Sequence, residues 1–180
     1  MIHEIYNVFS FCVQVWALTY LIPPFIKSFS TRRQIEFLKS KITDKEIKDI
    51  LDSLELVIEF RLFKPSPAAV CSFEKERFTI LWINSYWFNL LNSRRKLAAL
   101  YHEALHVKLR HDKICSTMLV NRACDLVINQ LLVKQYGFEK KDIKNFATIR
   151  NSFSFRMRKN VLEDQTVDYY IVKLMEDRWF

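Results

Sequence analysis

Two stretches of the sequence decide its fold and its chemistry: YHEALHVKLRH at residues 101–111 and NRACDLVINQLL at residues 121–132. The first contains two histidines, His102 and His106, with a glutamate directly after the first of them, in the order H-E-x-x-H. Four residues advance an α-helix by about 400°, so the two imidazoles lie one turn apart on the same face. Two imidazoles at this separation can bind one Zn²⁺. The sequence therefore predicts a metal site on this helix.

Glu103 follows the first histidine and is predicted to be the catalytic residue. It lies close enough to take a proton from a water molecule on the metal without being a ligand itself, which is the arrangement of metal-dependent hydrolysis. The alternative is a helix whose histidines are exposed or hydrogen-bonded in the core. The chain has only four histidines, and three of them fall between residues 102 and 111. This concentration favours the metal site.

A third metal ligand is needed, and the helix predicted after the H-E-x-x-H helix offers Asp125. Buried carboxylates are rarely left unpaired, so an aspartate among apolar neighbours calls for a partner, and a metal ion would be one. A second helix packed against the first would bring Asp125 to the metal. Asn121 and Asn129 lie one turn away on the same face. The alternative is an ordinary surface aspartate.

His111 is the other candidate for the third ligand. It stands nine residues after His102, which places it on the opposite side of any continuous helix. It could reach the metal only if the helix ended near Leu109, and the sequence has no glycine there to make such a turn. We therefore predict Asp125 as the third ligand. His111 is the alternative third ligand, or a residue that contacts the ligands without binding the metal itself.

The composition excludes several classes of function. The 180 residues include a single glycine, Gly137, so no Gly-rich phosphate loop, dinucleotide-binding fingerprint or nucleophile elbow can be formed. We expect no nucleotide cofactor. The net charge of +8 is spread along the chain and no nucleic-acid-binding module accompanies it, so nucleic acid is not favoured as a partner.

The N-terminal segment Ile5–Ile26 carries no charged residue and is long enough to cross a bilayer. Polar residues interrupt it and a pair of prolines, Pro23-Pro24, is expected to end it, so we favour a buried core helix over a membrane anchor. The four cysteines form no C-x-x-C pair and indicate buried thiols in a reducing compartment. The expected location is cytoplasmic, and the alternative is a chain anchored in a membrane through Ile5–Ile26.

The hydrophobic periodicity predicts helices before and after a small sheet, and therefore a single α+β domain over residues 1–180 that is mostly helical. Helices are expected at 31–41, 44–54, 85–91, 94–110, 117–135 and 164–175, and strands at 56–63, 69–73 and 77–83. Thr43 and Ser93 are the predicted N-caps of the second and fourth helices.

The two stretches together resemble a metallopeptidase domain of bacteria and phages that often precedes a von Willebrand-A-like segment. The pattern of that family is H-E-x-x-H-x-x-x-x-H followed by A-x-D-x-x-I-N, and the matching residues are His102, Glu103, His106, His111, Ala123, Asp125, Ile128 and Asn129. The resemblance covers about residues 78–132 and implies a zincin-like core at 66–180. In this core a small sheet precedes the H-E-x-x-H helix, and the following helix carries the third ligand. Residues 1–65 would form a helical N-terminal extension.

The leading hypothesis is a zinc-dependent peptidase that acts on a peptide or protein substrate. Three protein ligands would leave the fourth position of the metal to water, and Glu103 would act as general base and then as proton donor to the leaving amine. The strand at 77–83 is expected to offer an edge to an extended peptide. Help for the oxyanion is expected from one of four residues: His111, Tyr101, Tyr169 or Tyr170.

The alternative hypothesis is a catalytically inactive, metal-stabilised interaction protein, of the kind a phage would encode. Its basic surface or the Ile5–Ile26 segment would bind a host protein, nucleic acid or a membrane. A metal closed in by four protein ligands would favour this alternative, because an open position is needed for catalysis.

Overall fold

The computed structural model describes residues 22–61, 66–73, 78–111, 117–144, 146–148, 152–154 and 156–178. The fold is α+β and mostly helical with a small three-stranded sheet, as predicted. Its elements in chain order are α2 (Ile22–Lys39), α3 (Lys45–Ser53), β1 (Glu55–Glu59), β2 (Ala68–Phe73), β3 (Phe78–Asn84), α4 (Ser85–Asn89), α5 (Ser93–Lys108), α7 (Met118–Lys134), the 3₁₀ helix η1 (Met157–Asn160) and α9 (Val167–Arg178).

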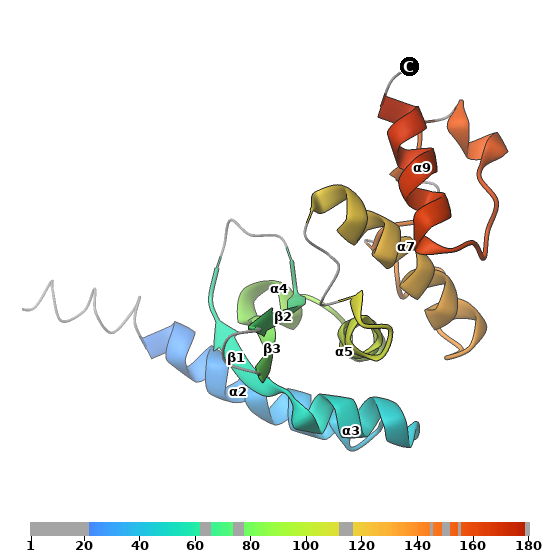
Figure 1. Ribbon diagram of the computed structural model, residues 1–180. Helices are drawn as coiled ribbons and strands as arrows, with labels where there is room; N and C mark the ends of the chain where they lie inside the picture. The colour runs from blue at the N-terminus through green and yellow to red at the C-terminus, as the bar shows by residue number, and fades with distance from the viewer. Residues whose placement is uncertain are drawn as a thin grey trace, which may run out of the picture.

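Helix α5, which carries the H-E-x-x-H motif, lies at the centre of the molecule (Figure 1). It contacts α2 and α3 on one side, strand β2 on another and α7 on a third. Helix α9 packs against α7, on the far side of that helix from α5 (Figure 1). Because other elements cover α5 on several sides, its polar side chains between Tyr101 and His106 are buried.

The sheet has the strand order β1-β3-β2, with β1 parallel and β2 antiparallel to the central strand β3. The prediction that the strand at 77–83 offers a free edge is therefore wrong, because β3 is paired on both sides. The antiparallel neighbour β2 is the strand that contacts α5. Because β1 and β3 are parallel, a long crossover connection must join them, and no local pattern in the sequence predicts it.

Backbone hydrogen bonding shows which groups of β2 face away from β3. The amide of Asn84 donates to the carbonyl oxygen of Pro67 at 3.0 Å, so these two opposite residues form a hydrogen-bonded pair. Pairs alternate along an antiparallel ladder, and Ala68 and Val70 consequently turn their backbone N–H and C=O groups to the outer edge of β2. The Ser66 hydroxyl donates to the Ala68 carbonyl oxygen at this edge.

Two helix N-caps differ by one residue from those predicted. Asp44, and not Thr43, caps α3 by accepting from the amide of Ile47 at 3.0 Å. Asn92, and not Ser93, caps α5 by accepting from the amide of Arg95. Asp, Asn, Ser and Thr have similar N-cap free energies, so the packing of the helix decides which of two neighbouring candidates is used.

The start of helix α2 also differs from the prediction. The sequence predicts a helix that starts at Thr31, but the observed helix starts at Ile22. Pro23 and Pro24, which are expected to end the preceding segment, lie in its first turn. Proline is tolerated there because the first N–H groups of a helix have no intrahelical partner. Most of the predicted Ile5–Ile26 helix lies outside the described residues. Among the helices that are described, none combines the length and the apolar character needed to cross a bilayer.

The main hydrophobic cluster contains residues from both sides of position 65. Side chains of α2 and α3 pack in it with those of the sheet, α4, α5 and α7, and its fully buried members include Ile35, Leu51, Leu81, Phe88 and Leu100. A second cluster joins α7 to α9 around the buried Tyr170. Helix α7 thus packs against α9 on one side and presents another side to α5.

Candidate metal centre

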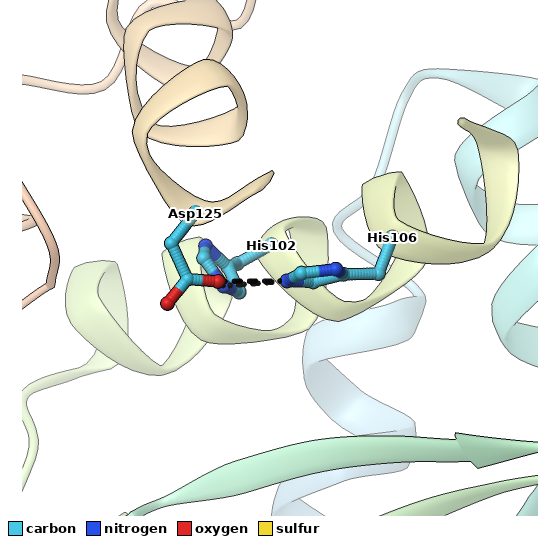
Figure 2. A group of neighbouring side chains, drawn as sticks. All are labelled: His102, His106 and Asp125. Atoms are coloured by element: carbon cyan, nitrogen blue, oxygen red, sulfur yellow. Dashed lines mark hydrogen bonds and ion pairs between the residues drawn. The ribbon is translucent and has the colours of Figure 1, made fainter. Parts of the chain in front are cut away.

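Three side chains from two helices converge on one point (Figure 2). Helix α5 supplies His102 and His106, and α7 supplies Asp125. His106 Nε2 lies 3.1 Å from His102 Nε2 and 3.0 Å from Asp125 Oδ1, and the distance from His102 Nε2 to Asp125 Oδ1 is 3.3 Å. The structure therefore brings the three residues predicted as ligands together.

The size of this triangle suits a small divalent ion. Neighbouring ligand atoms of a tetrahedral zinc site with bonds of about 2.0–2.1 Å lie about 3.3 Å apart. The three distances here, 3.0, 3.1 and 3.3 Å, are close to that value. Two imidazole nitrogens and a carboxylate oxygen are also a donor set that zinc uses. The side chain of Asp125 is 21% exposed, so the group is open on one side.

Asn129 fixes the orientation of the His102 ring. Its amide nitrogen donates to the carbonyl oxygen of Ala147 at 2.7 Å, so its amide oxygen faces His102 Nδ1 at 2.9 Å. An amide oxygen only accepts hydrogen bonds, and His102 Nδ1 must therefore carry the proton. The lone pair of this imidazole is then on Nε2, the atom that points to His106 and Asp125. This is how a metal-binding histidine is usually held.

The charge of Asp125 is stabilised by the two histidines. Burial by itself raises the pKa of this carboxyl group, but hydrogen bonds from His102 and His106 in their protonated forms, and the attraction of these charged rings, outweigh it, and the pKa falls below its usual range. A carboxylate that stays ionised beside two imidazoles is ready to act as an anionic metal ligand.

Glu103 is buried and has the opposite shift. Burial raises its pKa above the ordinary carboxyl value, while nearby His102 and His106 and a hydrogen bond from the backbone of Val70 lower it by less. Val70 lies in β2, and its backbone N–H is one of those that face the outer edge of the sheet. A carboxyl group whose pKa is raised toward neutrality is suited to accept and release a proton.

Two of the three proposed ligands, His102 and Asp125, border the same cavity as Glu103. A hollow of about 180 Å³ is lined by His102, Glu103 and Asp125. Its remaining walls come from the start of β2, from α5 and from the chain after α7; they are Ser66, Pro67, Ala68, Ala99, Phe146 and Ala147. The arrangement can hold a metal ion, a water molecule and a buried base next to the edge of a β-strand.

His111 lies beside this group but not in it. It is buried, and its ring centre is 5.6 Å from that of His106, but its nitrogens are not among the converging ligand atoms. The helix ends near Leu109, as an approach of His111 to the metal site would require. Helix α5 stops at Lys108, and Arg110 adopts a left-handed conformation with φ of 58°. The turn thus forms without a glycine, and it places the His111 ring beside that of His106.

The strain at Arg110 gives a testable prediction. A left-handed conformation costs an L-residue about 1–2 kcal/mol, and glycine avoids this cost but loses more entropy on folding. We expect Arg110→Gly to raise the free energy of unfolding by about 0.5–1 kcal/mol, measured by denaturant titration. Arg110→Ala is the matched control, because it removes the same exposed side chain but keeps the Cβ atom. Equal stabilities of the two variants would contradict the prediction.

Other residues considered from the sequence have different positions. Asn121 is exposed, whereas Asn129 is buried. None of the three tyrosines proposed for the oxyanion lines the cavity: Tyr101 packs on Tyr136 and Phe138, and Tyr169 and Tyr170 bond to backbone near η1 and α9. The structure therefore does not bring these tyrosines to the ligand group.

Sequence reasoning also missed several residues of the site. Asn129 could be placed on the face of Asp125 by its spacing, but no pattern revealed its bond to His102. Phe146, whose ring centre is 5.1 Å from that of His102, and Ala147 belong to an irregular segment that carries no motif. The start of β2 also enters the cavity only through the tertiary packing.

Comparisons with protein-family models, with curated proteins and with solved structures gave no match. The function is therefore inferred from the geometry of the His102–His106–Asp125 group and its cavity.

Proposed function

We propose that this chain is a zinc-dependent peptidase in which His102, His106 and Asp125 hold the metal and Glu103 is the general base. The observation that carries the proposal is that two features lie side by side at one cavity, which His102, Glu103 and Asp125 line. One is a triangle of ligand atoms with zinc-like spacing, and the other is a buried carboxyl group that is not part of the triangle.

Zinc bound here would supply a Lewis acid that polarises the scissile carbonyl group and lowers the pKa of a water molecule. Glu103 takes the proton of the attacking water and then delivers it to the leaving amine. Its burial supports this role, because the raised pKa brings the protonated and ionised forms closer in free energy near neutral pH. Asn129 keeps the His102 lone pair directed at the ligand position.

An extended peptide substrate is expected to lie along β2 and not along β3. The outer edge of β2 offers the backbone of Ala68, which lines the cavity, and the carbonyl oxygen of Val70, whereas the Val70 N–H donates to Glu103. Pairing with this edge would hold a peptide bond beside Glu103 by main-chain hydrogen bonds. The same features support a zincin-like fold for the core: a sheet before the H-E-x-x-H helix, an antiparallel strand over that helix and a third ligand from the next helix.

The number of ligands also favours the peptidase over the inactive interaction protein. Within the part of the chain that the structure describes, three ligand atoms lie within 4.8 Å of one another and His111 is not one of them. Three protein ligands with an open position are typical of catalytic zinc sites, and four of structural ones.

Metal loading tests the proposal directly. We expect the purified chain to retain about one zinc ion after dialysis and to hydrolyse members of a quenched fluorescent peptide library. A chelator should abolish hydrolysis, and added zinc should restore it. Metal content is measured by plasma mass spectrometry and hydrolysis by fluorescence. Hydrolysis that persists after complete removal of the metal would refute the proposal, as would a chain that retains no zinc.

A further inference from the structure

A second and larger cavity lies next to the metal cavity. It has a volume of about 540 Å³, within the range of about 300–1,000 Å³ that is usual for ligand pockets. Ala147 lines both cavities, and Asn129, which supports His102, lines this one as well. A molecule bound at the metal therefore has this cavity as its neighbour.

The floor of the larger cavity is apolar and its rim is basic. Leu126 and Val133 of α7 and Ile143 from the following segment form the apolar part. The charged groups at the rim are three lysines and one glutamate: Lys134, Lys140, Lys144 and Glu163. Such a lining suits a ligand with an apolar body and an acidic group.

The charges at the rim are not all available to a ligand. Lys134 is paired with Asp164, and its pKa is raised mainly by that hydrogen bond and also by Glu163 nearby. The charges of Lys134, Asp164 and Glu163 therefore largely cancel. Lys140 and Lys144 are exposed, and among the described residues no carboxylate lies within ion-pairing distance of either. Two ammonium groups four residues apart in sequence thus give this side of the rim an excess of positive charge.

We propose that this cavity is a substrate subsite that binds a carboxylate carried next to an apolar side chain. The inference rests on the proposed peptidase function, because the substrate is the occupant that would span the metal cavity and its neighbour. Leu126, Val133 and Ile143 receive the apolar side chain, and Lys140 and Lys144 attract the carboxylate. The carboxylate comes either from the C-terminus of a peptide or from an acidic side chain, and the experiment separates these sources.

Two pairs of small probes test the subsite by NMR titration of the full chain. N-acetyl-leucine and N-acetyl-leucinamide differ only in a terminal carboxylate. The amides of N-acetyl-leucyl-glutamate and N-acetyl-leucyl-glutamine differ only in a side-chain carboxylate. We expect the acidic member of one pair to bind about fivefold more tightly than its neutral partner, since two exposed ion pairs contribute modestly. The methyl signals of Leu126, Val133 and Ile143 should shift on binding, and higher salt should reduce the preference.

The double variant Lys140→Gln/Lys144→Gln keeps most of each aliphatic stem but removes both charges, and it should lose the preference. The matched control is Lys45→Gln/Lys48→Gln, which changes the net charge equally at two exposed lysines of α3 and should keep the preference. A carboxylate held by the metal would be insensitive to both variants. Equal binding of acid and amide by the wild-type chain would overturn the inference, and so would an unchanged preference in the Lys140/Lys144 variant.

Binding and hydrolysis separate the two proposals. Charge-dependent binding that disappears in the Lys140/Lys144 variant supports the subsite even where no peptide is cleaved, and the peptidase proposal alone would then fail. Metal-dependent hydrolysis without any preference for a carboxylate overturns the subsite and leaves the peptidase proposal standing.

Discussion

Glu103→Gln is expected to abolish peptide hydrolysis while leaving zinc bound. The amide has nearly the same shape as the carboxyl group but cannot take the proton of the attacking water. General-base catalysis contributes about 10²- to 10⁴-fold to a rate, and kcat should fall by that factor. Because the three proposed ligands are untouched, zinc affinity should change by less than about twofold. Steady-state kinetics and metal titration on the same preparation measure both quantities.

The matched control for this variant is Glu55→Gln. Glu55 is exposed in β1, and the change alters the net charge equally without touching the cavity. It should keep wild-type kcat. Wild-type hydrolysis in Glu103→Gln would remove Glu103 from the mechanism, and a loss of zinc with Glu103→Gln would show that this residue is a ligand and not the base.

Asp125→Asn is expected to weaken zinc binding by more than about 100-fold. Changes in the residues behind metal ligands already cost about 10- to 100-fold, and this change replaces a proposed ligand by a neutral amide. The effect can be measured as stability: zinc at about 100 times the wild-type Kd should stabilise the wild-type chain by about 2.7 kcal/mol and the variant by less than about 0.5 kcal/mol. Hydrolysis at limiting zinc should fall in parallel.

Asp49→Asn is the control for the loss of an aspartate charge, since Asp49 is exposed on α3. It should respond to zinc as the wild-type chain does. Circular dichroism of the metal-free proteins shows whether Asp125→Asn is folded. A folded Asp125→Asn that gains as much stability from zinc as the wild-type chain would contradict the assignment of Asp125, and His111 would then become the leading candidate for the third ligand.

Much of the local structure could be predicted because it depends on neighbouring residues. The helical period puts His102 and His106 on one face wherever the helix lies in the fold. Short runs of mostly apolar residues at 69–73 and 77–83 mark two strands of the sheet. Boundaries were less accurate: Asp44 and Asn92 replaced Thr43 and Ser93 as caps, since neighbouring cap candidates differ little in free energy.

The site could not be predicted in full, because it depends on contacts between residues that are far apart in the sequence. The sheet order depends on the parallel pairing of β1 with β3, and it moves the free edge beside α5 from the strand at 77–83 to β2. The left-handed conformation of Arg110 is also unpredictable from residue type, because non-glycine residues adopt it only where surrounding packing compensates for the strain.

By itself, the sequence determined the α+β class, the helix with two imidazoles on one face, and the carboxyl groups of Glu103 and Asp125 as candidates for its chemistry. Periodicity and residue type fix these features locally. Only the tertiary structure decided that Asp125 meets both histidines, that the Ala147 carbonyl orients Asn129 and thereby His102, and that β2 borders the cavity. These features depend on distances between separate elements, which are set by the packing of α5 against α7 and the sheet.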